Sequence, residues 1–113
     1  MEKKNTKKPI INKYGDKFWI NEKGLYHRDN GPSIEWIEGE KWWYKNGITH
    51  RLDGPAIEYE DGDREWLQNG RYHRLDGPAK IYNDGEKYWY IYNENLTKEE
   101  FNSWKKRIQK ILL

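Results

Sequence analysis

Aromatic, aliphatic and charged residues alternate in short runs along most of the chain, and pairs of turn-forming residues separate these runs. The segment Asp63–Gln68 reads DREWLQ and lies between Asp61-Gly62 and Asn69-Gly70. A period of two is typical of a β-strand with two different faces, and Asp-Gly or Asn-Gly between such runs is a strong hairpin signal. The pattern therefore predicts antiparallel strands over Ala56–Glu60 and Asp63–Gln68, with type I′ turns at both pairs.

This pattern recurs with a period of 23 residues. Gly-Pro pairs mark the period, at Gly31-Pro32, Gly54-Pro55 and Gly77-Pro78, and they end the motifs HRDNGPS, HRLDGPA and HRLDGPA. A tryptophan stands four residues after the glycine of each preceding turn, at Trp19, Trp43, Trp66 and Trp89. A period of 20–50 residues indicates stacked repeats. We predict a mainly β fold, an elongated antiparallel β-meander of hairpin repeats over residues 9–96.

The two ends of the chain depart from the repeat. After Trp89 the chain reads YIYNEN, so the Asn-Gly turn is absent there. Thr97 and Glu100 then form a capping box, and apolar residues follow at helical spacing, at Phe101, Trp104, Ile108, Ile111 and Leu112. We expect an amphipathic helix over residues 97–113 that covers the open end or one face of the sheet. Residues 1–8 are basic and are expected to be disordered.

Composition narrows the function classes. The 113 residues include 7 Trp and 9 Tyr, and 35% of them are charged, so a core must be built largely from amphipathic rings. The absence of cysteine excludes disulfides, thiolate metal sites and a cysteine nucleophile. No run approaches the ~20 apolar residues that a membrane-spanning helix needs. We expect a soluble cytoplasmic protein without membrane insertion, and a net charge of +2 is too small to imply a nucleic-acid partner by itself.

The repeat resembles a known family. A 23-residue unit with Trp-x-x-Asn-Gly and Asp-Gly resembles the MORN repeat, and the variant with His-Arg-x-Asp-Gly-Pro-Ala and LTKEEF resembles repeat proteins of phages and large DNA viruses. The resemblance covers about Lys13 to Phe101. It implies a scaffold or binding surface, and one related bacterial branch consists of antitoxins. His-Arg-x-Asp stands where MORN proteins prefer small residues and Gly-x-Gly, so their lipid binding is not carried over.

The repeated motif itself is interpreted as a structural corner between units. Asn30 stands where the later copies have Asp53 and Asp76, which favours a turn role over carboxylate chemistry. An enzyme needs one converged site, whereas these residues are copied along a rod, so we expect no catalysis, no metal site and no cofactor. The predicted corner residues are His27, Arg28, His50, Arg51, Asp53, His73, Arg74 and Asp76.

Two sets of residues are candidates for binding, because side chains alternate between the faces of a strand. Surplus aromatic rings mark a protein-binding surface, although the helix or a second copy of the chain would also cover them. This set is Trp36, Trp42, Tyr44, Tyr59, Tyr88 and Tyr90. The alternative is a strip for nucleic acid or a phosphorylated nucleotide, made of Lys17, Lys41, Arg64, Lys87, Trp43, Trp66, Arg51 and Arg74.

The resulting hypothesis is a non-catalytic protein-binding module. The resemblance sharpens it to a small phage-type or antitoxin-type inhibitor that occludes a partner protein, for example a component of host defence, in the host cytoplasm. The alternatives are the phosphate-binding strip and a structural assembly protein that forms homodimers through the C-terminal helix.

Overall fold

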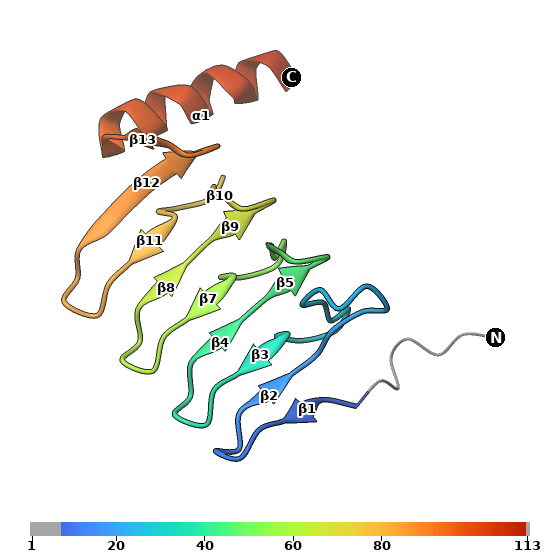
Figure 1. Cartoon of the computed structure of the whole chain (residues 1–113). Coiled ribbons are helices and arrows are strands. Elements are labelled where there is room, and N and C mark those ends of the chain that lie inside the picture. Colours follow the sequence, from blue (N-terminus) through green and yellow to red (C-terminus); the bar gives the residue numbers. More distant parts are fainter. Residues whose placement is uncertain (1–7, 113) are drawn as a thin grey trace.

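The computed structural model describes residues 8–112 and confirms the mainly β meander with a C-terminal helix (Figure 1). Residues 1–7, which make up nearly all of the basic segment predicted to be disordered, lie outside the described residues. Every strand pair in the described chain is antiparallel, and nine strands form one sheet. In spatial order these are β1 (Ile10–Ile11), β2 (Lys17–Phe18), β3 (Ile34–Glu35), β4 (Lys41–Trp42), β7 (Ile57–Glu58), β8 (Arg64–Glu65), β11 (Lys80–Ile81), β12 (Lys87–Ile91) and β13 (Glu94–Leu96).

Two further hairpins continue strands of this sheet on the side away from the Asp-Gly turns (Figure 1). They are β5 (Tyr44–Lys45) with β6 (Ile48–Thr49), and β9 (Leu67–Gln68) with β10 (Arg71–Tyr72). Each repeat therefore contributes one long strand line, such as β8 followed by β9, and a return line that is interrupted between β10 and β11. The interruption is the segment that carries the His-Arg-x-Asp-Gly-Pro motif.

The two kinds of turn differ in backbone geometry. At Asn46-Gly47 both φ angles are positive, 50° and 81°, as a type I′ turn requires. The type I′ prediction for Asp61-Gly62 is wrong: only Gly62 has a positive φ, 98°, and its N–H donates to the carbonyl of Tyr59 at 3.0 Å. This is a type I turn that ends in a left-handed glycine, which spares Asp61 the conformation that a side chain disfavours.

The last hairpin keeps its turn without the Asn-Gly pair. Tyr92 and Asn93 occupy the two central positions with φ of 47° and 72°, and they join β12 to β13. The Asn-Gly pair is thus absent after Trp89, as the sequence shows, and the chain still reverses there. Neighbouring contacts hold Tyr92 in this uncommon conformation, since its ring stacks on that of His73 with 4.0 Å between centroids.

The helix α1 (Lys98–Leu112) lies at the β13 end of the sheet and contacts β12 and β13 (Figure 1). The capping box is confirmed: the Thr97 N–H donates to a Glu100 carboxylate oxygen at 2.8 Å, and the Glu100 N–H donates to the Thr97 hydroxyl at 3.0 Å. Phe101 is buried, Trp104 and Ile108 are half-buried and Ile111 is 76% exposed, so the cover over these four residues decreases along the helix.

The fold is a single layer. Its principal dimensions are 48 × 38 × 17 Å, and the shortest of them leaves no room for a second layer over either face of the sheet. The central core is correspondingly small and consists of Ala56, Ile57 and Leu67, with half-buried aromatic residues packed against them. Much of each sheet face is therefore in contact with solvent.

Candidate functional site

Each His-Arg-x-Asp-Gly-Pro segment is a loop that leaves the sheet over one tryptophan and returns to it. The Trp66 carbonyl accepts a hydrogen bond from the His73 N–H at 3.1 Å, and the Trp66 N–H donates to the Ala79 carbonyl at 2.7 Å. One residue of the long strand therefore pairs with both ends of the loop, and residues 74–78 are pushed out of the ladder. Trp19 and Trp43 make the same two bonds in their units. We call these three loops, residues 28–32, 51–55 and 74–78, the corners.

An arginine fills the space under each corner. The guanidinium of Arg51 lies 3.9 Å from the centroid of the Trp43 ring, and its Nη1 donates to the Pro55 carbonyl at 3.0 Å. On its other side is Gly54, where an added Cβ would lie 2.7 Å from Arg51 Cζ. The arginine is thus held between a tryptophan ring and a glycine that has no room for a side chain. Arg28 and Arg74 stack on Trp19 and Trp66 at 3.8 and 3.9 Å.

The carboxylates beside the arginines are less essential to this geometry. Arg51 Nε donates to Asp53 at 3.1 Å, but the Asp53 side chain is 89% exposed. In the first corner Asn30 takes this position, and Arg28 still bonds to the Pro32 carbonyl and to Glu35. The substitution therefore removes one exposed ion pair and leaves the stack in place, which supports a structural interpretation of the motif.

The histidines connect each corner to the next repeat. The Nδ1 atoms of His27, His50 and His73 accept the backbone N–H of Asn46, Asn69 and Tyr92, at 3.0, 2.9 and 3.1 Å. An imidazole must be unprotonated at Nδ1 to accept such a bond. Burial lowers the pKa of His50 and His73 below the ordinary value of 6.5, and the nearby Lys45 adds to the effect at His50.

The three imidazoles do not converge on one site, because each one bonds within its own pair of units. Within residues 8–112, no three His, Cys, Asp or Glu side chains gather as a metal site would require. The corner residues therefore act between neighbours along the sheet.

The strand register separates the side chains of the sheet into two unlike faces. Cross-strand partners share a face, and they form two continuous rows through β2, β3, β4, β7, β8, β11 and β12. One row, on what we call the charged face, is Lys17, Glu35, Lys41, Glu58, Arg64, Ile81 and Lys87. The other, on what we call the aromatic face, is Phe18, Ile34, Trp42, Ile57, Glu65, Lys80 and Tyr88.

The charged face holds the residues predicted for phosphate binding, but it is not a continuous basic strip. Glu35 and Glu58 lie directly between the basic residues of the row, and they also bond to Arg28 and Arg51 at 3.3 Å. The rings of Trp43 and Trp66 on this face are covered by Arg51 and Arg74. Sequence spacing identified the basic row and missed the glutamates, because these belong to the intervening return strands.

The aromatic face brings together the six residues predicted for protein binding. Ring contacts run without a break from Trp36 through Phe18, Tyr26, Tyr44 and Trp42 to Tyr59, with centroids 5.3–6.4 Å apart. Two further pairs continue the surface toward the helix, namely Tyr72 with Tyr90 at 5.2 Å and Tyr82 with Tyr88 at 5.8 Å. Sequence analysis did not single out Phe18, Tyr26, Tyr72 and Tyr82, although they follow the same alternation.

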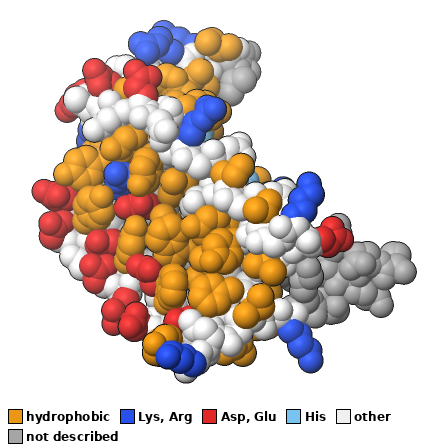
Figure 2. All heavy atoms as spheres, viewed as in Figure 1, with side chains coloured by type: hydrophobic (Ala, Val, Ile, Leu, Met, Phe, Trp, Pro, Cys, Tyr) orange, Lys and Arg blue, Asp and Glu red, His pale blue; other side chains and the backbone are white. Residues whose placement is uncertain are grey.

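Figure 2 shows hydrophobic side chains gathered over the strands and acidic side chains along the edge formed by the Asp-Gly turns. Tyr26 is exposed and the other rings of this surface are half-buried, so the rings shelter one another while each keeps part of its area in solvent. Burial, with the charges of Glu65 and Glu40, raises the pKa of Tyr59 to about 12. The aromatic face is thus apolar with a negative bias.

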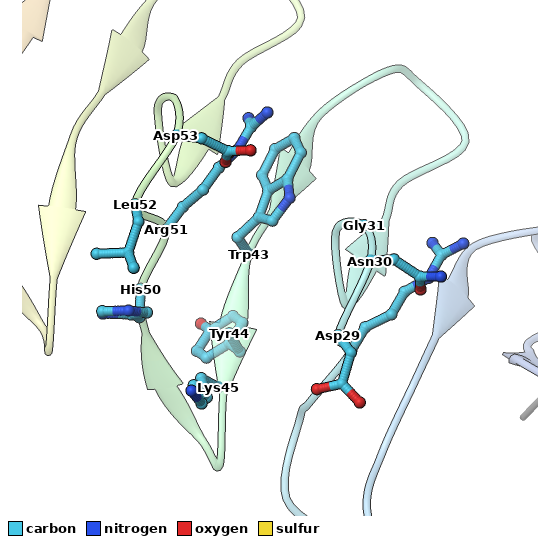
Figure 3. Close-up of a pocket in the computed structure, with 11 residues that line it drawn as sticks. Asp29, Asn30, Gly31, Trp43, Tyr44, Lys45, His50, Arg51, Leu52 and Asp53 are labelled. Carbon is cyan, nitrogen blue, oxygen red and sulfur yellow. The ribbon is translucent and has the colours of Figure 1, made fainter. Parts of the chain in front are cut away.

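A groove of about 670 Å³ lies between the first two corners. Figure 3 shows Trp43 and Arg51 on one side of it and Asn30 and Gly31 on the other. The two arginines that line this groove are bonded within their own corners, and Asp29 bonds to the ring of His27 at 2.9 Å. The arginines of this groove thus serve the corners.

Comparisons of the chain with known protein families, characterised proteins and solved structures find no match. None of the described residues form a helix with the length and apolar character needed to span a membrane. The functional argument below rests on the two faces of the sheet.

Replacing Arg51 by lysine tests the corner. A lysine cannot reproduce a planar cation stacked on Trp43 and bonded to the Pro55 carbonyl, so we expect Arg51→Lys to lower the free energy of unfolding by about 1–2 kcal/mol. The matched control is Arg64→Lys, because Arg64 is exposed on the same face and lies 5.7 Å from the Trp66 ring. Urea unfolding measures both variants, and equal losses would contradict the role given to the stack.

The histidine bonds predict a dependence of stability on pH. The pKa values of His50 and His73 are lower in the folded chain than the ordinary 6.5, so the unfolded chain binds protons first as the pH falls. The contribution of the two neutral histidines to the free energy of unfolding is therefore complete above pH 6.5. It is lost as the pH falls below that value. Urea midpoints at about pH 7.5 and 5.5 measure this loss, and it should shrink in the double variant His50→Asn, His73→Asn. An unchanged midpoint in the wild-type chain would disprove the link.

Proposed function

We propose that the chain is a non-catalytic protein-binding module that docks a partner on its aromatic face. The observation that carries the proposal is the unbroken run of partly exposed rings from Trp36 to Tyr59, with no second layer above it. Monomeric proteins rarely expose contiguous apolar surface of this kind outside interaction sites, and Trp and Tyr dominate the energetics of protein interfaces.

The mechanism we propose is occlusion. The corners and the cross-repeat histidine bonds fix the sheet before a partner arrives, so little ordering free energy is lost on binding. A rigid surface of this kind can cover a functional region of another protein without any chemistry of its own. We extend the proposal to a small phage-type or antitoxin-type inhibitor, which is what the MORN-like resemblance implies.

The charged face is the weaker candidate. From Lys17 to Arg64 the basic residues of its row alternate with glutamates, which reduce the positive potential that the row presents to a phosphate chain. Arg51 and Arg74, two cations of the nucleic-acid hypothesis, already stack on the half-buried Trp43 and Trp66 within their corners. The aromatic face therefore fits a protein partner better than the charged face fits nucleic acid.

Site-specific photocross-linking in the cells from which the chain comes tests this proposal. The photoreactive residue p-benzoylphenylalanine replaces Tyr44 on the aromatic face or, as the matched control, Arg64 on the charged face. We expect a discrete cross-linked protein from position 44 only, and excess wild-type chain should compete for it whereas a folded Trp36→Ala chain should compete poorly. No cross-link at position 44, or the same product from position 64, would contradict the proposal.

A further inference from the structure

Rings and carboxylates alternate along the Asp-Gly edge of the aromatic face. In each repeat an aromatic residue and an acid face one another across the turn, joined by a 2.9 Å hydrogen bond from the ring residue's backbone N–H to the acid's backbone carbonyl. The register places both side chains on the aromatic face, since they lie two positions from members of its row. The pairs are Trp36 with Glu40, Tyr59 with Asp63, and Tyr82 with Glu86. We call these three pairs the ring–acid pairs.

The carboxylates of these pairs have no cationic partner within the described residues. No ion pair forms at Glu40, Asp63 or Glu86, whose only side-chain bonds there are from the Asn83 N–H to Asp63 and from the Tyr88 hydroxyl to Glu86. The basic residues of the neighbouring strands lie on the charged face, on the far side of the sheet, except Lys80, which lies on the aromatic face and makes no ion pair with a described residue. The negative charge of the ring–acid pairs is therefore available to a partner.

A carboxylate deeper in the aromatic face has the same character. Glu65 is 7% exposed and accepts the Tyr72 hydroxyl at 3.1 Å, and it too forms no ion pair with a described residue. Its charge adds to that of Glu40 and Asp63 around Tyr59, whose pKa is raised first by burial and then by these charges. The centre of the aromatic face is thus both apolar and negative, which suits a cation with an apolar stem.

The sheet itself contains one example of how this face holds a cation. Lys80 occupies the row position where the earlier repeats have Ile34 and Ile57, and its cross-strand neighbour is Glu65. Its Nζ lies 4.1 Å from the Tyr72 ring centroid and 5.1 Å from that of Tyr90. A lysine thus lies over two tyrosines beside a carboxylate, an arrangement that the uncovered ring–acid pairs offer without an internal cation.

The spacing of the pairs suggests the form of the partner. Equivalent positions of successive repeats are two strand spacings apart. Neighbouring strands are about 4.8 Å apart, so the pairs recur every ~10 Å. A segment in the polyproline II conformation rises about 3.1 Å per residue with three residues per turn, so every third side chain lies on the same side at intervals of about 9 Å. A polyproline II segment with a basic residue at every third position would match all three pairs.

We propose that the aromatic face recognises a basic segment of its partner protein, with a lysine or arginine over each of the three ring–acid pairs. This inference rests on the proposed function and specifies the chemistry of the partner. Charge complementarity selects a basic protein segment over an acidic one, and the aromatic rings select cations that carry an apolar stem or a planar head.

A synthetic peptide tests the inference on the purified chain without knowledge of the partner. The probe has about twelve residues, with arginine at every third position and serine between. One control has the same composition with the arginines in a single block, and another has glutamate in place of arginine. Fluorescence anisotropy at low salt should show binding of the spaced probe about threefold or more tighter than the block control, and no binding of the glutamate control.

Matched variants then locate the binding. Glu40 makes no side-chain bond to the described residues, so Glu40→Gln removes one charge from a ring–acid pair without breaking a bond. This variant should bind the spaced probe more weakly, by about threefold or more. Glu22→Gln removes the same charge at the opposite edge of the sheet and should leave binding unchanged. Tyr59→Phe keeps the ring and should retain binding, whereas Tyr59→Leu should lose it, with melting curves confirming that each variant folds.

Equal binding of the spaced and block peptides, or equal effects of Glu40→Gln and Glu22→Gln, would overturn the inference. So would a cross-linked partner that contacts the aromatic face through a segment without basic residues. If cross-linking from position 44 succeeds while the peptide fails, the inference falls and the proposed function stands. If cross-linking fails, the proposed function falls whatever the peptide does.

Discussion

The structure depends on the packing of one arginine between one tryptophan ring and one glycine in each corner. A single-layer sheet has no opposing layer in which to bury its aromatic side chains, so it must cover them from within the same chain. The corner does this on the charged face, where Arg28, Arg51 and Arg74 lie over Trp19, Trp43 and Trp66. The glycine is required because a side chain there would meet the guanidinium, and both hydrogen-bonding groups of the tryptophan backbone anchor the loop.

This arrangement gives the two faces of the sheet different roles. The charged face carries the corners and the row of charged residues, and two of its glutamates bond to corner arginines. The aromatic face has no such cover, and its rings contact mainly each other. Because the corners and the histidine bonds hold neighbouring repeats in register, the aromatic face is presented as a fixed surface. The fold thus stabilises itself through one face and leaves the rings of the other without a covering layer.

Much of the fold follows from the period of the sequence, whereas most of the chemistry of the faces does not. The repeated Gly-Pro and turn pairs predict the meander, and Thr97 with Glu100 predicts the start of the helix. The geometry at Asp61-Gly62 was mispredicted because the dipeptide fits two turn types and only the strand register chooses between them. The glutamates beside Lys41 were missed because they become neighbours only through pairing with return strands. Tyr92 adopts the positive φ of a turn residue although Asn-Gly is absent there, because its ring stacks on that of His73. This contact between residues far apart in the chain could not be foreseen from the sequence.

Amide hydrogen exchange tests the central claim, that the corners are closed and locked on their tryptophans, most directly. The Trp43 and Trp66 N–H groups bond to Ala56 and Ala79 beneath the corners, at 2.8 and 2.7 Å. The account predicts that these two amides exchange as slowly as the amides of the central strands β7 and β8, and far more slowly than that of Glu60 at a turn tip. If Trp43 and Trp66 exchange as fast as Glu60, the corners are open in solution and the account is wrong.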